Sequence, residues 1–206
     1  MIELQNISIS FEGKKVLTNF SCSFNQDELV AISGKSGCGK SSILNAVLGF
    51  ITPTAGEILY NGKKLESAYL LHFREQTAFL SQDISFPNQL VKEFIYAPFQ
   101  FKINKRNRPT TQQILTVFAE LEIEEEIYNM QLNELSGGQK QRVLLALMKL
   151  LNKKIWLLDE PTSALDSVSA DLVVRFLRSI PRKMIIAVTH DSRLAANFDR
   201  IIKLDQ

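Results

Sequence analysis

The chain has little of the features that mark secreted or membrane-spanning proteins. Its 206 residues include two cysteines, too few for a disulfide framework, so we expect a reduced compartment. The N-terminal stretch MIELQNISISF lacks the basic flank and apolar core of a signal peptide. The richest apolar stretches, VLLALMKLL and KMIIAVT, are too short to span a bilayer. A role at a membrane would therefore require another chain to supply the spanning part.

The chain also lacks an excess of charge and a linker-like segment. It has 24 basic and 22 acidic residues, a net charge of +2, which gives no reason to expect a nucleic-acid partner or a membrane surface as partner. No stretch rich in proline, glycine or serine divides it, and no repeat is visible. With 45% hydrophobic residues, a chain of this length can bury one substantial core. We therefore expect a single domain over residues 1–206.

Four short apolar runs predict the strands of a buried parallel sheet: ELVAIS, TAFLS, IWLL and MIIAVT. Each run is followed at once by glycine or a polar residue, namely Gly34, Gln82, Asp159 with Glu160, and His190. In open parallel sheets, ligands bind outside the C-terminal ends of the strands. The four strand ends therefore predict one shared site.

The remaining sequence predicts two additions to this α/β core. IELQNISISF, SCSFNQ (21–26) and GEILYNG alternate in polarity and are bounded by turn residues, which indicates an antiparallel β layer. From about residue 86 to 150 the spacing becomes helical, as in TQQILTVFAELEI. We expect residues 1–85 and 151–206 to form the α/β core with its antiparallel layer, and 86–150 to form a mostly helical insert.

A phosphate-binding loop follows the first parallel strand. Gly34, Gly39, Lys40 and Ser41 match the pattern G-x-x-x-x-G-K-[ST], between a buried strand and the helical stretch SSILNAVLGF. The glycines let backbone N–H groups surround phosphates, while the lysine reaches the β and γ phosphates and the serine hydroxyl meets Mg²⁺. This motif predicts a nucleotide hydrolase.

The stretch IWLLDE supplies the acidic half of such a site. Asp159, at the end of a buried strand, can hold Mg²⁺ through its water shell, and Glu160 is then placed to polarise an attacking water. The alternative is that Asp159 only caps the next turn. The phosphate loop favours the metal role.

Further motifs carry a family resemblance. LSGGQKQR at 135–142 is similar to the signature motif of ATP-binding cassette (ABC) proteins, and Gln82 matches their Q-loop glutamine. SALD at 163–166 matches the D-loop, and His190 in VTHD matches the H-loop histidine. Phe11 stands where the family places an aromatic that stacks on adenine, although a core position is the alternative. In order and spacing, over nearly the whole chain, the sequence resembles the ATPase subunit of an ABC transporter.

This resemblance implies a fold, cofactors and site residues. The fold is the ABC type of the P-loop NTPase (RecA-like) α/β core, with an antiparallel β layer and a helical subdomain that carries the signature motif. ATP and Mg²⁺ are the cofactors. The catalytic residues implied are Lys40, Gln82, Glu160 and His190, and the Mg²⁺ ligands are Ser41, Gln82 and Asp159. The nucleotide-binding positions implied are Phe11, Gly34, Lys35, Ser36, Gly37, Cys38, Gly39, Lys40, Ser41, Ser42, Gln82, Ser136, Gly137, Gly138, Gln139 and Asp166.

The resemblance also implies partners. Two such subunits pair head to tail, and each ATP lies between the phosphate loop of one chain and the signature of the other. Ser136 and Gly138 would then donate to the γ-phosphate of the partner's nucleotide. A separate transmembrane permease subunit is the second expected partner, so we expect a cytoplasmic chain peripheral on the inner face of the cell membrane.

Other ABC classes fit less well. A non-transport ATPase of the DNA-repair or translation kind usually has a long coiled-coil insertion or two cassettes, which 206 residues do not hold. A regulatory subunit without turnover conflicts with the presence of Glu160 and His190. A membrane-associated ATPase of the cell-division type stays open. The substrate is not readable, although residues 94–109 resemble the corresponding stretch of bacterial cassettes for metal (iron) export.

The stretch 86–101 is the expected contact with the permease. We expect some of its large apolar side chains to line a groove for a short cytoplasmic helix of the membrane subunit. The alternative is that all of them pack inside the insert. These side chains are Phe86, Phe94, Ile95, Tyr96, Phe99 and Phe101.

Overall fold

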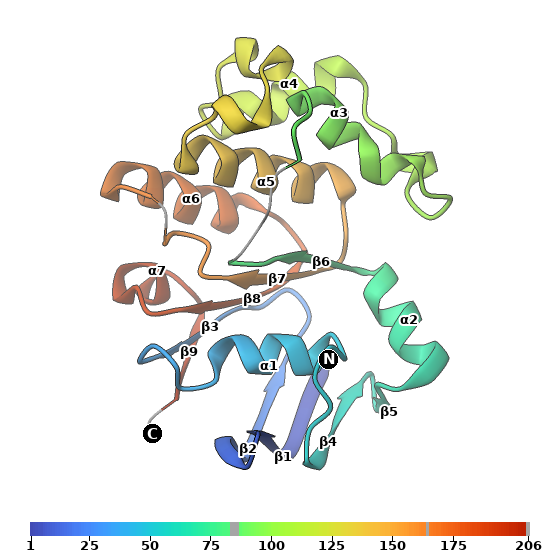
Figure 1. The fold of residues 1–206 in the computed structure, drawn as a ribbon, viewed down its shortest axis with the longest axis vertical. Coiled ribbons are helices and arrows are strands. Elements are labelled where there is room, and N and C mark those ends of the chain that lie inside the picture. Colours follow the sequence, from blue (N-terminus) through green and yellow to red (C-terminus); the bar gives the residue numbers. More distant parts are fainter. Residues whose placement is uncertain (83–86, 164, 205–206) are drawn as a thin grey trace.

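A parallel sheet of five strands forms the centre of the molecule (Figure 1). The computed structural model describes residues 1–82, 87–163 and 165–204. The strand order is β6-β7-β8-β3-β9, and the four predicted strands are confirmed. The edge strand β9 was not predicted, because RIIKL alternates in exposure and is not a continuous apolar run. The strands are β3 (Leu29–Gly34), β6 (Thr77–Leu80), β7 (Ile155–Asp159), β8 (Met184–Thr189) and β9 (Arg200–Leu204).

A second, antiparallel sheet confirms the predicted N-terminal layer, in the order β2-β1-β4-β5. One boundary was wrong: β2 begins at Lys14, not at Ser21. Glu12 and Gly13 have φ angles of 47° and 81°, which makes a tight hairpin that pairs Phe11 with Lys14 at once. The strands are β1 (Ile2–Phe11), β2 (Lys14–Phe24), β4 (Ala55–Tyr60) and β5 (Lys63–Lys64).

Helices cover both faces of the parallel sheet. In Figure 1, α1 lies below the sheet and α5 and α6 lie above it. Successive residues of β7 alternate between two cores: Leu157 packs with α1 and the antiparallel sheet, and Leu158 packs with the helices above. The α-helices are α1 (Lys40–Val47), α2 (Ser67–Glu75), α3 (Val91–Tyr96), α4 (Thr111–Glu120), α5 (Gly137–Leu151), α6 (Ser167–Ser179) and α7 (Ser192–Ala196).

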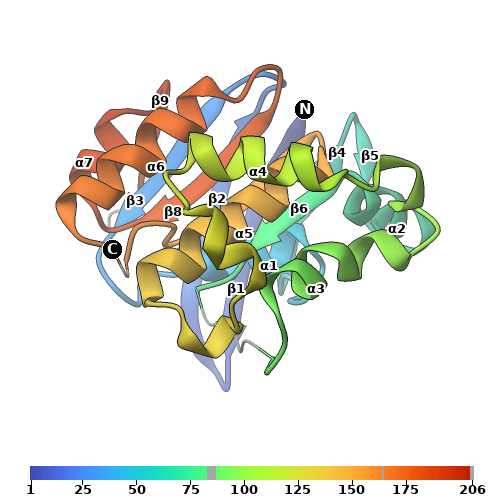
Figure 2. The ribbon, with the colours of Figure 1, turned by 90° about the horizontal axis from the view of Figure 1, so that it is seen from above.

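The segment expected to be helical consists of α3, α4, α5 and four short 3₁₀ helices. Seen from above, α4 lies over α5, and α5 lies over the sheet (Figure 2). Every residue of α5 from Val143 to Met148 is buried, because the helix packs against both layers. The 3₁₀ helices are η1 (Ala97–Gln100), η2 (Lys105–Asn107), η3 (Glu125–Asn129) and η4 (Leu132–Glu134).

The aromatic-rich stretch 86–101 divides between core and surface. Ile95 and Phe99 are 0% and 1% exposed, so neither is among the side chains that could line an open groove. Both lie in the upper core because α3 and η1 turn them toward the sheet and α5. Phe94 and Tyr96 are partly buried against that core, whereas Phe101 is 68% exposed. Phe86 lies outside the described residues.

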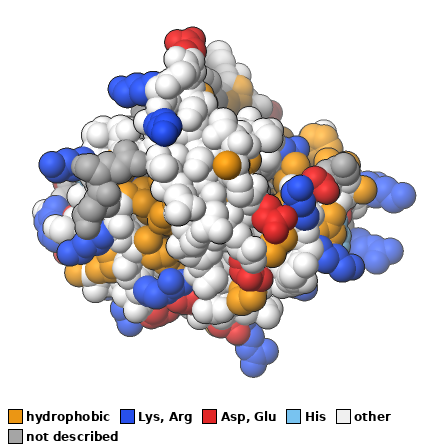
Figure 3. Space-filling model, turned by 90° about the horizontal axis from the view of Figure 1, so that it is seen from below, with side chains coloured by type: hydrophobic (Ala, Val, Ile, Leu, Met, Phe, Trp, Pro, Cys, Tyr) orange, Lys and Arg blue, Asp and Glu red, His pale blue; other side chains and the backbone are white. Residues whose placement is uncertain are grey.

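The lower face of the molecule is mostly uncharged at its centre (Figure 3). Seen from below, uncharged polar side chains and backbone dominate its centre, and charged side chains lie around the margin (Figure 3). Among the described residues, no helix has the length and apolar character needed to cross a bilayer.

Candidate active site

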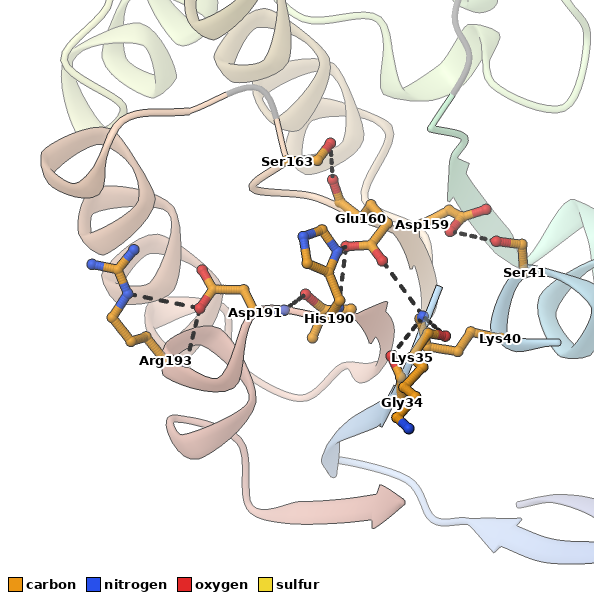
Figure 4. A network of polar contacts seen from close by, with 11 residues as sticks. Gly34, Lys35, Lys40, Ser41, Asp159, Glu160, Ser163, His190, Asp191 and Arg193 are labelled. Carbon is orange, nitrogen blue, oxygen red and sulfur yellow. Dashed lines mark hydrogen bonds and ion pairs between the residues drawn. The ribbon is translucent and has the colours of Figure 1, made fainter. Parts of the chain in front are cut away.

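The C-terminal ends of β3, β7 and β8 bring three of the predicted catalytic residues, Lys40, Glu160 and His190, together at one edge of the sheet (Figure 4). The register pairs Ser33 of β3 with Thr189 of β8, and Asp159 of β7 with Val188 of β8. The residues that follow each strand therefore meet, although they come from distant parts of the sequence. Parallel pairing brings these strand ends together, and their forming one shared ligand site stays a prediction.

The phosphate loop needs glycine at two close approaches. A Cβ atom on Gly34 would lie 2.9 Å from the carbonyl oxygen of Leu204. Gly39, at φ 96°, caps α1, and a Cβ atom there would lie 3.0 Å from Cγ1 of Val16. Both glycines therefore let the loop curl tightly between β2, β9 and α1.

Lys40 spans the mouth of this loop. Its side chain is buried, and Nζ donates to the carbonyl oxygens of Gly34 at 2.9 Å and Lys35 at 3.0 Å. The same Nζ lies 3.9 Å from Oε1 of Glu160. The ammonium group is thus held against the loop, where it can contact a phosphate that the loop binds.

Ser41 and Asp159 form an oxygen pair beside the loop. The Ser41 hydroxyl donates to Oδ1 of Asp159 at 2.9 Å, across 118 residues of sequence. A hydroxyl and a carboxylate at this spacing suit Mg²⁺, which prefers oxygen ligands and keeps several of its water or phosphate ligands. The residues present therefore fit the expected metal ion.

Glu160 is a buried carboxylate between a cation and an imidazole. Its Oε2 lies 2.9 Å from Nδ1 of His190 and accepts the His190 backbone N–H at 3.3 Å. Glu160 has a φ of 49°, unusual for a non-glycine residue, and its own N–H donates to the carbonyl of Val188 at 2.9 Å. The end of β8 therefore fixes where this carboxylate points. A fixed carboxylate here can accept a proton from a water molecule.

Gln82 and Phe11 lie at the surface near this edge. Gln82 is exposed and follows β6. Because Leu80 of β6 pairs with Leu158, the residue before Asp159, Gln82 lies at the same edge of the sheet as Asp159. Phe11 is 45% exposed at the end of β1. This exposure excludes a core position, the alternative left open by the sequence.

The signature motif begins α5, above the sheet, whereas the phosphate loop begins α1, below it (Figure 1). Ser136 caps α5: its Oγ accepts from the N–H of Gln139 at 3.2 Å, and its own N–H donates to Oε1 of Gln139 at 2.9 Å. Gly137 and Gly138 form the first turn of the helix. Within one chain, the two helix starts are therefore separate.

Sequence reasoning missed a connection between the signature helix and the segment after Glu160. The side-chain amide of Gln141 donates to the carbonyl of Pro161 at 3.0 Å. A Cβ atom on Gly138 would lie 3.3 Å from Cδ2 of Leu165. The spacing of Gly138 and Gln141 by three residues, on one helical face, was the available signal.

Asp166 has a local structural role. Its Oδ1 accepts from the N–H groups of Ser169 at 3.0 Å and Val168 at 2.9 Å, which caps α6. The hydrogen bonds from Ser169 and Val168 hold the pKa of Asp166 below its ordinary value. A nucleotide-binding role for Asp166 would have to coexist with this cap.

Comparison with known proteins identifies the family. The model of the ABC transporter family matches residues 17–163. The chain belongs to this family. It is 32% identical to the probable iron export ATP-binding protein FetA of Escherichia coli, covering 99% of this chain and 91% of FetA. It is 34% identical to the methionine import ATP-binding protein MetN of Carboxydothermus hydrogenoformans, and spans 64% of the length of that relative.

Solved structures of ABC cassettes have the same fold. The dimeric structure of MJ0796, a bacterial ABC transporter cassette, matches with a TM-score of 0.84 and 30% identity over 98% of this chain and 94% of that one. A dimeric post-hydrolysis state of MJ0796, bound to ADP and Pi, matches with a TM-score of 0.83. The predicted ABC ATPase fold is therefore confirmed. As a member of this family, the chain is an ABC-type ATPase cassette with ATP and Mg²⁺ as its ligands.

Proposed function

We propose that this ABC cassette is the ATP-hydrolysing motor of a transporter whose membrane-spanning subunit is a separate chain. The observation that carries the proposal is the placement of Glu160, between His190 at 2.9 Å and Lys40 at 3.9 Å. A carboxylate held beside the phosphate loop suits hydrolysis. A regulatory cassette that only binds nucleotide would not need it.

Each residue of this edge has a proposed role. Lys40 binds the β and γ phosphates, and Glu160 orients and deprotonates the attacking water. His190 holds the Glu160 carboxylate and contacts the γ-phosphate. Ser41, Asp159 and Gln82 would hold Mg²⁺, which would neutralise charge on the phosphates. Phe11 stacks on adenine, and residues 34–42 surround the phosphates with backbone N–H groups.

A second copy of the chain completes the site. The signature residues Ser136 to Gln139 lie above the sheet and the phosphate loop below it, so the signature is proposed to serve the partner's nucleotide. The backbone N–H groups of Gly137 and Gly138, in the first turn of α5, suit an anionic ligand. The similar cassette MJ0796 has a dimeric solved structure, which supports a dimer of this chain. The head-to-tail pairing with ATP between the subunits is part of the proposal.

The permease is proposed to dock through about residues 86–101 and at the sheet edge formed by β6. A groove of about 280 Å³ opens there between α2, the edge strand β6 and α5. Its walls include Phe79, Leu147 and Ile103, and the exposed Phe101 adjoins it in sequence. Apolar walls of this kind suit a short amphipathic helix. The chain would then be peripheral on the cytoplasmic face of the membrane.

The transported substrate is left to the membrane subunit. The relatives are named for different substrates, methionine for MetN and iron for FetA. Metal (iron) export, which the resemblance of residues 94–109 suggested, is one candidate among these. A non-transport or cell-division ATPase is the alternative function.

The experiment is to express the chain with a multi-span membrane protein, should its neighbouring genes encode one. We expect co-purification, and ATP hydrolysis by the complex that changes when the membrane protein is reconstituted in lipid. Hydrolysis by the chain alone, with no association and no effect of the membrane protein, would favour a non-transport ATPase.

A further inference from the structure

The segment between η1 and α4 concentrates positive charge. The chain as a whole has a net charge of +2, yet residues 94–119 contain no acidic residue. Within them, residues 101–108 carry four basic side chains, all exposed. We call residues 101–108 the basic turn. Its charged residues are Lys102, Lys105, Arg106 and Arg108.

Two apolar side chains accompany this charge. Phe101 is 68% exposed and Ile103 is 47% exposed. Both are among the large hydrophobic residues that the fold leaves most open to water. Basic residues interleaved with exposed aromatic and aliphatic side chains are typical of surfaces that bind the interface of a membrane.

The basic turn is held in place by the fold. The backbone N–H groups of Asn104 and Lys105 both donate to the carbonyl of Phe101, at 3.0 Å each. The side chain of Asn104 donates to the carbonyl of Pro98 at 3.0 Å and accepts from Nζ of Lys153 at 2.6 Å. The turn therefore presents its exposed side chains in one arrangement, which lowers the entropy lost on binding.

One acidic residue lies beside the turn: Glu75 lines the groove together with Ile103 and Asn104. Glu120, in α4, is paired with Lys149. Lys153, whose side chain reaches Asn104, adds a further cation. Burial lowers the pKa of Lys153, and the charge of Glu75 opposes this shift.

We propose that the basic turn contacts a bilayer surface rich in anionic lipid. This inference rests on the proposed function, because Ile103 and Asn104 also line the groove proposed for the permease, and this side would then face the membrane. Figure 1 shows the segment between α3 and α4 projecting at the right-hand edge of the molecule. A projecting turn suits a flat bilayer surface as its partner. An acidic helix of another protein would fit less well as a partner, because a helix binds in a groove.

The expected strength is modest. Each basic residue near an anionic surface strengthens partitioning by roughly fivefold. Four such residues, with one partly inserted aromatic ring, would give the isolated chain weak and reversible binding, detectable with excess vesicles, and would assist a subunit already held by its permease. The contact would weaken with added salt.

The test uses the purified full chain and sedimented vesicles. We expect binding to vesicles of 30% phosphatidylglycerol in phosphatidylcholine, and none to pure phosphatidylcholine. The double variant K105Q/R106Q should bind roughly thirty-fold more weakly, since two charges are lost. F101S should weaken binding while keeping the charge.

The matched control is R193Q/K203Q, which removes two exposed charges from α7 and β9, away from the basic turn. We expect this variant to bind as the unchanged chain does. Equal binding to both vesicle types, equal losses in the control, or no binding to either would overturn the proposal. If K105Q/R106Q instead lost only its permease, the turn would be a protein contact and the lipid proposal would be wrong.

The result of the vesicle test can be distinguished from the result of the test of the motor proposal. ATP hydrolysis by K105Q/R106Q should be normal, because neither residue touches the nucleotide site. A chain that hydrolyses ATP and ignores anionic vesicles overturns only the lipid contact. A chain that binds these vesicles but does not hydrolyse ATP overturns only the motor.

Discussion

The carboxylate of Glu160 and the imidazole of His190 form a pair whose Oε2–Nδ1 distance is 2.9 Å. Glu160 is 7% exposed, whereas the His190 side chain is 62% exposed. The carboxylate is therefore withdrawn from bulk water, and the imidazole reaches from it toward the surface. This arrangement places the Glu160 carboxylate beside the phosphate loop, 3.9 Å from Nζ of Lys40.

Replacing Glu160 with Gln should separate ATP binding from hydrolysis. The amide keeps the size of the side chain but cannot take a proton from water, so we expect turnover to fall by roughly 10² or more. Nucleotide affinity should change little, because Lys40 and the loop remain. Steady-state hydrolysis and equilibrium binding measure both quantities, with the exposed Glu124→Gln as control. Near-normal turnover in Glu160→Gln would show that another group is the base.

The same variant should dimerise in the presence of ATP. Bound ATP would bridge the phosphate loop of one chain and Ser136 of the other, and without hydrolysis the bridge would persist. Light scattering should show a monomer without nucleotide and a dimer with ATP and Mg²⁺. Adding Ser136→Glu should abolish the dimer by placing negative charge against the γ-phosphate. A dimer that is equally stable without nucleotide would contradict the proposal that ATP joins the two subunits.

Phe99 and Phe101 form a matched pair for testing the aromatic-rich segment. Phe99 is 1% exposed, so Phe99→Asp should remove roughly 3–5 kcal/mol from the free energy of unfolding, and more for the buried charge. Phe101 is 68% exposed, so Phe101→Asp should change the free energy of unfolding by about 0.5 kcal/mol or less. Thermal or urea unfolding distinguishes them. Similar losses in both variants would show that Phe101 packs against another part of the chain.

Gln141 should affect turnover only by positioning Glu160, through its hydrogen bond to the carbonyl of Pro161. Gln141→Leu leaves the carbonyl of Pro161, next to Glu160, without its donor at 3.0 Å. We expect kcat to fall by roughly tenfold while KM for ATP stays similar, because small displacements of a catalytic group are costly. Gln112→Leu, on the exposed face of α4, is the control. An unchanged kcat would show that the contact does not position Glu160.

The phosphate loop could be predicted from the sequence because its chemistry is local. The spacing of Gly34, Gly39, Lys40 and Ser41 is set within eight residues, where backbone conformation and the start of one helix decide the geometry. The four apolar runs of the parallel sheet were equally clear, since strands buried on both faces must be apolar throughout.

Only the tertiary structure decided which distant residues meet and which apolar side chains are covered. The Glu160–His190 pair spans 30 residues, and its geometry depends on the parallel register of β7 with β8. Phe99 and Phe101 are two residues apart with similar local sequence, yet one is core and the other surface, because α5 and β6 supply packing on one side only. Local sequence specifies backbone conformation and polarity, but burial depends on what other elements lie opposite, and that is settled only when the chain has folded.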